Sequence, residues 1–348
     1  MTTGLAIVAM VVGVSLLIVV HEAGHFLVAR RFGMRVERFS IGFGPVLARF
    51  RGVGTEFAIS ALPLGGYVRI AGMGPGEAVD PQDRGLYSNQ PAWRRFAVIL
   101  AGPAMNYVAA VLVAWGLLAT LGLRAPDPAP RIGPLVPGMP AEAAGLRQGD
   151  RIVSVAGRPV DTWLGLVQEL QRHPAEEIAL EVDRGEAGRT VLRITPRNDG
   201  GVGRVGFRQA EVVVRDRPVR SLVEAVARTN ANAGLQIGAF ASLLSRKQHA
   251  EITGPVGIAQ ELVRGARAGA EPFLTLVWTI SIVLALLNLF PLPALDGGRL
   301  VFLAWEIVTR RRVNERVESY VHFAGFVALV ALVLAVTVFK DLVRLLGG

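Results

Sequence analysis

The chain has 348 residues, of which 51% are hydrophobic, and its formal net charge is +9. This length allows a membrane bundle together with one soluble domain of about 100 residues. The basic residues are mostly arginines spread among acidic residues, so no basic tract for nucleic acid is present. There is no cysteine, which excludes disulfides and thiolate zinc sites and leaves histidine and carboxylate groups as metal ligands.

Four segments are long and apolar enough to cross a bilayer, for which about 20 residues are needed. They cover residues 5–28, 96–123, 273–305 and 321–339. The four residues before the first segment have no basic region typical of a signal peptide, so we expect this segment to be retained. The predicted fold is therefore a polytopic α-helical membrane protein with four transmembrane helices.

The first segment contains His21-Glu22-Ala23-Gly24-His25. On a helix the two histidines share one face, so one metal ion can reach both, and Glu22 can take a proton from a metal-bound water. Such a short pattern also occurs by chance, and a helical histidine is more often structural. Ionisable residues in an apolar segment are costly, however, and are functional candidates for that reason. We therefore predict a metal site here, with Glu22 as the catalytic base.

Arginines near the segment ends predict the orientation in the membrane, because short basic connections stay in the cytoplasm. They follow the first segment, precede the second and separate the third from the fourth: Arg30, Arg31, Arg35, Arg38, Arg84, Arg94, Arg95, Arg310, Arg311, Arg312 and Arg316. Both termini and the long loop between the second and third segments are then expected outside the cytoplasm. The metal motif is expected toward the cytoplasmic side.

Between the first two segments, residues 57–62 and 66–70 indicate two short strands around a turn at 63–65. We expect a membrane-associated β-hairpin, a re-entrant β element over about 56–71, that dips toward the metal motif. Residues 71–91 have the composition of an ordinary loop. In the second segment, Gly102-Pro103 permits close helix contact, and Asn106 needs a hydrogen-bond partner. We assign Asn106 a supporting position around the ligands.

A Pro-rich linker over 124–130 leads into a region of strands and turns. Its passage 138–152 matches the pattern PA-x-x-AGL-x-x-GD-x-I, and a helix over 162–171 and strands over 178–183 and 189–195 follow. This region resembles a PDZ domain of the circularly permuted bacterial type. PDZ domains bind extended peptides or chain termini beside a strand, although such a domain could also act only by obstructing access. An extended connector over 200–220 and an amphipathic helix over 221–244 are expected next.

The third membrane segment ends in an irregular, partly polar sequence. Pro291 and Pro293 break the helix and free backbone groups that must find partners. Asp296 follows at membrane depth, where an unpaired charge is costly and a metal ligand is neutralised. The alternative partner of Asp296 is Arg299 at the membrane edge. The remaining histidines, including His322, lack ligand spacing and are interpreted as surface or interfacial residues.

Catalytic zinc typically has three protein ligands and an open position for water. We therefore predict one Zn²⁺ per chain, bound by His21, His25 and Asp296. The predicted domains are residues 1–123 with the first two spans and the β element, 124–200 with the PDZ domain, 201–270 with amphipathic helices, and 271–348 with the last two spans.

Together these motifs resemble the site-2 protease family of intramembrane zinc metalloproteases, in its bacterial RseP/RasP-type branch. The resemblance rests on HExxH, GGYV-x-I-x-GM, AGP-x-x-N, the PDZ passage, GPVGI and N-x-x-P-x-P-x-LDGG, and it covers almost the whole chain. The chain departs from the proteobacterial pattern because it has room for only one PDZ domain. The resemblance implies regulated intramembrane proteolysis in a bacterial inner membrane. Its substrates would be single-span proteins shortened on the outside, such as anti-sigma factors, or remnant signal peptides.

The resemblance also implies roles for individual residues. Glu22 would act as general base and then donate a proton to the leaving amine, and Asn288 would hydrogen-bond the substrate backbone. The strand that contains Gly66, Tyr67, Val68 and Arg69 would pair with an unwound substrate. Pro291 and Pro293 would support the ligands, as would Asn106. The alternatives are a non-proteolytic membrane PDZ adaptor, which would not need Glu22 and Asp296, and a metal transporter, which usually has an internal repeat.

Overall fold

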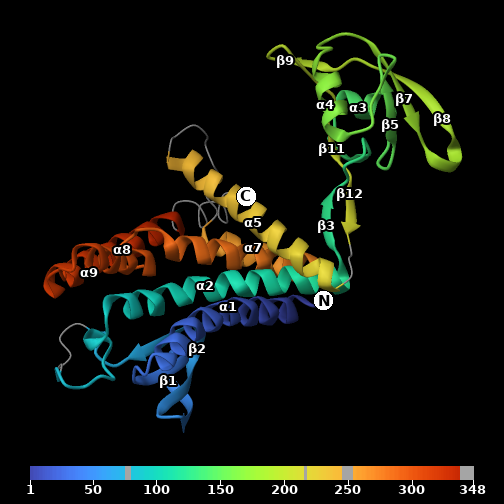
Figure 1. The fold of residues 1–348 in the computed structure, drawn as a ribbon. Coiled ribbons are helices and arrows are strands. Elements are labelled where there is room, and N and C mark those ends of the chain that lie inside the picture. Colours follow the sequence, from blue (N-terminus) through green and yellow to red (C-terminus); the bar gives the residue numbers. More distant parts are fainter. Residues whose placement is uncertain (75–79, 215–217, 245–253, 338–348) are drawn as a thin grey trace. The chain divides into compact units, whose positions relative to one another are not determined.

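The computed structural model describes residues 1–74, 80–214, 218–244 and 254–337 (Figure 1). The chain divides into two compact units. The first, which we call the helical unit, comprises Met1–Leu121 and Asp216–Gly348. The second, which we call the inserted unit, comprises Gly122–Arg215.

Among the described residues, four helices of the helical unit are long and apolar enough to cross a membrane, as predicted. They are α1 (Thr3–Arg31), α2 (Ala92–Gly116, continued by a π-helical turn to Leu121), α7 (Ala270–Leu289) and α9 (Glu315–Val336). The predicted third segment is wrong in its length, because α7 ends at Leu289 and a separate helix, α8, covers Asp296–Thr309. Phe290 is extended, as a residue before proline usually is. The predicted end of the fourth segment, at residues 338–339, lies outside the described residues.

The helical unit also contains two long antiparallel strands, β1 (Val36–Gly52) and β2 (Thr55–Ile70). The predicted hairpin is wrong in its pairing, because residues 57–62 and 66–70 are two halves of β2 that both pair with β1. Phe39 of β1 lies opposite Val68 on one side and opposite Phe57 on the other. The first half of β1 is therefore central in the sheet, and residues 66–70 form an edge.

A hydrophobic core joins this sheet to the helices. Its buried members come from the end of α1, both strands, the loop before α2, α2 itself and α8: Ala29, Met34, Val36, Ile70, Tyr87, Val98, Ile99, Leu300 and Leu303. Helices α1 and α2 lie side by side (Figure 1). They approach closely at Gly24, where an added Cβ would lie 2.7 Å from the carbonyl carbon of Ala101. The sheet and three helices thus meet around the second half of α1.

The loop before α2 is anchored to the sheet by backbone bonds and by charge. The N–H of Arg35 donates to the carbonyl oxygen of Gly85, and that of Tyr87 donates to Ala71. A hydrogen bond from the Gly85 N–H and the Arg35 guanidinium, 3.0 Å away, hold the pKa of the Asp83 carboxyl below its usual value. The described second half of the predicted loop, residues 80–91, is therefore held in one place.

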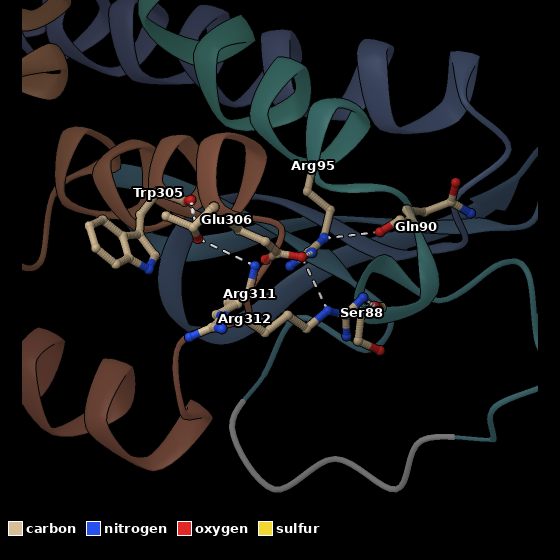
Figure 2. A network of polar contacts seen from close by, with 8 residues as sticks. Ser88, Gln90, Arg95, Trp305, Glu306, Arg311 and Arg312 are labelled. Carbon is tan, nitrogen blue, oxygen red and sulfur yellow. Dashed lines mark hydrogen bonds and ion pairs between the residues drawn. The ribbon is translucent and has the colours of Figure 1, made fainter.

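A polar network ties the beginning of α2 to the end of α8 (Figure 2). The buried Arg95 donates to the carbonyl oxygen of Gln90 and to the carboxylate of Glu306. Arg312, which follows α8, donates to the same carboxylate at 3.2 Å and to the carbonyl oxygen of Ser88 at 3.0 Å. Because loss of one partner would leave a buried charge uncompensated, this network fixes α8 against α2.

The inserted unit is a small α+β domain with its own core. Its elements are β3 (Leu123–Pro126), β4 (Ile132–Leu135), α3 (Pro140–Ala143), β5 (Arg151–Val155), β6 (Arg158–Pro159), α4 (Trp163–Gln171), β7 (Ile178–Asp183), β8 (Arg189–Ile194), β9 (Arg197–Asp199), β10 (Val202–Arg204), β11 (Phe207–Gln209) and β12 (Glu211–Val214). One sheet has the strand order β6-β5-β7-β8. The predicted helix and both predicted strands are present, and the side chain of Thr162 caps α4.

The predicted boundary of this domain at residue 200 is wrong. Strand β11 pairs with β4 and β12 pairs with β3, so the chain beyond residue 200 completes the unit. Within the range expected to be an extended connector, residues 202–204, 207–209 and 211–214 are strands of this unit. Helices α5 (Pro218–Leu244) and α6 (Pro255–Ala268) follow in the helical unit, and α5 covers the predicted amphipathic helix.

Candidate metal centre

Three nitrogen and oxygen atoms from α1 and α8 form a compact triangle. Nε2 of His21 lies 3.2 Å from Nε2 of His25, and Oδ2 of Asp296 lies 3.1 Å from the first and 3.3 Å from the second. Donor atoms around a tetrahedral zinc ion, with bonds of about 2.0–2.2 Å, lie about 3.3–3.6 Å apart. The three residues chosen from the sequence are thus together at nearly the spacing that such an ion needs.

The burial of these atoms also fits a metal ion. Both imidazoles are buried, and Oδ2 of Asp296 is buried with no well-formed hydrogen bond in the described part of the chain, its polar neighbours being the two imidazole nitrogens. A buried carboxylate oxygen without a donor is unfavourable unless a cation compensates it. The structure forms no Asp296–Arg299 ion pair between these two described residues, so the alternative partner is not used.

The other nitrogen of each ring is held by α2. Nδ1 of His25 lies 2.8 Å from the carbonyl oxygen of Val98, which can only accept, so this nitrogen carries the proton and leaves Nε2 free to bind a metal. Nδ1 of His21 lies 3.3 Å from Nδ2 of Asn106, whose own Oδ1 is buried without a partner among the described residues. A zinc ion bound at Nε2 of His21 would require a proton on Nδ1. It would therefore favour the Asn106 orientation in which Oδ1 faces the ring.

A hydrogen bond from the His21 ring to Asn106 predicts a loss of zinc affinity in one substitution of Asn106 and little loss in another. Asn106→Leu removes the acceptor and is expected to weaken zinc binding about 10–100-fold, as loss of such outer hydrogen bonds usually does. Asn106→Asp keeps an acceptor oxygen and is expected to retain most of the affinity. Competition with a calibrated chelator on the purified protein measures both. An equal loss in the two variants would contradict the role of the hydrogen bond.

Gly102 lets α2 lie directly against the imidazoles. An added Cβ at this position would lie 2.8 Å from Cε1 of His21 and closer still to the ring of His25. The sequence pattern Gly102-Pro103 predicted close helix contact but not the group that is contacted. The absence of a side chain at Gly102 is therefore a requirement of the site itself.

Glu22 faces the edge of β2. The N–H of Val68 donates to Oε2 of Glu22 at 3.1 Å, and an added Cβ at Gly66 would lie 3.7 Å from Cγ of Glu22. Because backbone groups alternate along a strand, Gly66 and Val68 direct theirs away from β1 and toward α1. The predicted strand edge thus lies beside the predicted base.

Two predicted substrate-binding side chains are engaged elsewhere in the sheet. The hydroxyl of Tyr67 accepts a hydrogen bond from Arg38 at 3.2 Å, and Arg69 pairs with Glu37 at 2.9 Å. Through these contacts the side chains of Tyr67 and Arg69 hold β2 to β1. The backbone of Gly66 and Val68 remains the part of this strand that faces Glu22.

The segment between α7 and α8 reverses sharply. Asn288 lies half-buried in the last turn of α7, and its amide has no hydrogen-bond partner among the residues that the structure describes. Pro291 is exposed and Pro293 is half-buried. Gly297 packs on the end of α7, where an added Cβ would lie 2.5 Å from the carbonyl carbon of Phe290. Gly297 thus allows α8 to begin directly against the end of α7.

The sequence interpretation missed one polar residue near this segment. His322 of α9, interpreted as surface or interfacial, is largely buried, and its Nδ1 lies 3.2 Å from the backbone nitrogen of Ala294. Lack of ligand spacing argued against it as a metal ligand but gave no signal for a contact with a backbone N–H.

Comparison of the chain with known proteins shows which family it belongs to. The model of Peptidase family M50 matches residues 9–332. The chain belongs to this family. The regulator of sigma-E protease RseP of Escherichia coli K12 is 29% identical over 440 residues, which cover 96% of this chain and 98% of that protein. A protein of Synechocystis named as a zinc metalloprotease is 34% identical over 337 residues, covering 94% and 92%. One of Brucella suis, named likewise, is 33% identical over 356 residues with the same coverage.

The family and the four apolar helices make this M50 peptidase an intramembrane zinc metalloprotease. The predicted family, enzyme class and zinc requirement are thereby confirmed. The names of the relatives favour a protease over the adaptor alternative.

Proposed function

We propose that this peptidase hydrolyses peptide bonds within the transmembrane segments of single-span membrane proteins, with one zinc ion bound by His21, His25 and Asp296. The observation that carries the proposal is the triangle of buried donor atoms beside Glu22, formed in the second half of the apolar helix α1 and at the start of α8. Zinc bound there would polarise the scissile carbonyl and lower the pKa of water toward about 7.

Glu22 acts as the general base in this proposal. The Val68 N–H holds one oxygen of its carboxylate, which orients the other to take a proton from the attacking water. The same carboxyl then gives the proton to the leaving amine nitrogen. The strand edge at Gly66–Ile70 therefore has a part in orienting the base.

The substrate binds as an extended strand along the edge of β2. A helical peptide bond is shielded, whereas an extended one can be held by backbone hydrogen bonds to an edge strand. The outward backbone groups of Gly66 and the outward carbonyl oxygen of Val68, whose N–H is held by Glu22, face the substrate. The side-chain amide of Asn288 hydrogen-bonds the substrate backbone near the scissile bond. Tyr67 and Arg69 support the sheet through Arg38 and Glu37. Pro291 and Pro293 shape the segment before Asp296.

The protein lies in a bacterial inner membrane, with the metal centre toward the cytoplasm and both termini and the inserted unit outside. Arginines at the ends of α1, α2 and α8 support this orientation. Exposed apolar side chains of the sheet, among them Phe43, Leu47, Phe50 and Leu62, favour its association with lipid. The substrates are shortened single-span proteins such as anti-sigma factors, or remnant signal peptides.

We interpret the inserted unit as a single PDZ domain that screens out substrates with bulky external parts. Phe207 of β11 packs against Trp163 of α4, with ring centroids 5.7 Å apart, and Gly203 of β10 lies against the last turn of α4. Because these contacts place β10 and β11 directly against α4, we favour screening over capture of a peptide. If the unit does bind a peptide or chain terminus, a separate open pocket of about 580 Å³ beside α3, lined in part by Met139 and Arg197, could hold it.

The test is cleavage of a single-span reporter, with and without its external domain, by the purified protein before and after removal of zinc. We expect the shortened reporter to be cut, zinc removal to stop cleavage, and added zinc to restore it. Equal cleavage of both reporters would contradict screening by the inserted unit. Failure of the zinc-loaded protein to cut the shortened reporter would contradict the proposed substrate class and favour a non-proteolytic adaptor.

A further inference from the structure

Helix α9 carries none of the proposed ligands, yet it contacts the segment that delivers Asp296. Nδ1 of His322 accepts a hydrogen bond from the N–H of Ala294 at 3.2 Å. One turn further along α9, Gly325 lies against Pro293, where an added Cβ would lie 2.8 Å from both the carbonyl carbon and the carbonyl oxygen. Two residues of α9 thus hold the two consecutive residues that precede Leu295 and Asp296.

The contacted backbone is strained. Ala294 has a φ of +80°, in the region that glycine adopts readily and alanine rarely does. Such a conformation persists only where its surroundings hold it. Ala294 is two residues before Asp296, so its conformation directs the chain into α8 and sets where the carboxylate lies.

His322 has no other evident reason to be buried. Its Nε2 is buried without a hydrogen-bond partner in the described part of the chain, and the nearest carboxylate oxygen, on Glu318, is 4.0 Å away. Its ring packs on Phe302 of α8, with centroids 5.7 Å apart. A phenylalanine could make that contact at lower cost, because a buried unsatisfied N–H is unfavourable. The bond to Ala294 is the contact that requires a histidine.

We propose that His322 and Gly325 are positioning residues that hold the Pro293–Ala294 turn so that Asp296 meets His21 and His25. This inference rests on the proposed ligand set. It makes α9 part of the zinc site: displacement of α9 removes the Ala294 hydrogen bond, releases the strained turn and moves the carboxylate away from the imidazoles.

The test measures zinc affinity of the full-length protein by chelator competition. His322→Phe keeps the packing on Phe302 but has no acceptor, and it is expected to weaken zinc binding about 10–100-fold. Ala294→Gly in the same protein should recover most of the loss, because glycine adopts this φ without help. Gly325→Ala should weaken binding through contact with Pro293. Phe323→Leu, at an exposed position of the same helix, is the control and should leave affinity unchanged.

Unchanged affinity in His322→Phe would overturn the proposal, and so would failure of Ala294→Gly to restore it. Asp296→Asn separates this result from the ligand assignment. If Asp296→Asn loses zinc and His322→Phe does not, only the positioning role fails. If Asp296→Asn binds zinc as tightly as the unaltered protein, the ligand assignment fails and the positioning role fails with it.

Discussion

Glu22→Gln is expected to lower kcat on a shortened single-span reporter by about 10²–10⁴-fold, the usual contribution of a positioned general base. Glutamine keeps the shape of the side chain, and its carbonyl oxygen can still accept the Val68 N–H. It cannot take a proton from water. Since the three proposed ligands are unaltered, the zinc content should stay at one ion per chain. Single-turnover cleavage together with metal analysis measures both quantities.

The control for this substitution is Glu261→Gln. Glu261 lies on α6 and forms an exposed ion pair with Arg264, so its loss should leave cleavage and zinc content as they are. Near-normal cleavage by Glu22→Gln with full zinc content would show that another group accepts the proton.

Gly102→Ala is expected to weaken zinc binding by more than about 100-fold, beyond the usual effect of losing an outer hydrogen bond. The methyl carbon would enter the space of both imidazoles, 2.8 Å from Cε1 of His21. The rings can move only by leaving the groups on α2 that hold them, the carbonyl oxygen of Val98 and the side chain of Asn106. Chelator competition measures the loss, and cleavage should fall with it.

Gly116→Ala is a matched control on the same helix. An added Cβ at Gly116 would meet nothing within 4 Å, and alanine has the higher helix propensity. This variant should bind zinc normally and melt at the same temperature or slightly higher. Normal zinc binding by Gly102→Ala as well would show that the backbone of α2 does not limit the position of the imidazoles.

Local chemistry explains what the sequence could predict. Hydrocarbon requires about 20 apolar residues per span, so the four helices are visible in composition alone. Charge at membrane depth is costly, which marks Asp296, and the four-residue spacing of His21 and His25 fixes a common helix face. Each of these signals lies within one segment, and the three ligands that catalytic zinc typically has join the two segments into one site.

Longer-range contacts explain what was missed. Strand β1 contains Gly42, Gly44 and Pro45, which interrupt an ordinary strand pattern in the sequence. Gly42 has a positive φ, and this part of the chain is recognisable as strand only from its pairing with β2. The closing strands of the inserted unit are three or four residues long and are specified by partners about 75–90 residues earlier. Likewise, nothing near His322 in the sequence indicates the N–H of Ala294.

The bond from Val68 to Glu22 has a consequence for any strand laid along the edge of β2. An N–H that donates to the carboxylate is occupied, so it cannot also complete the hydrogen-bond ladder with an incoming chain. One hydrogen bond between the two strands must therefore be missing. The carbonyl oxygen of the incoming strand opposite Val68 is then left without a donor directly beside the base. A gap in the pairing, rather than its completion, would then mark the peptide bond to be cut.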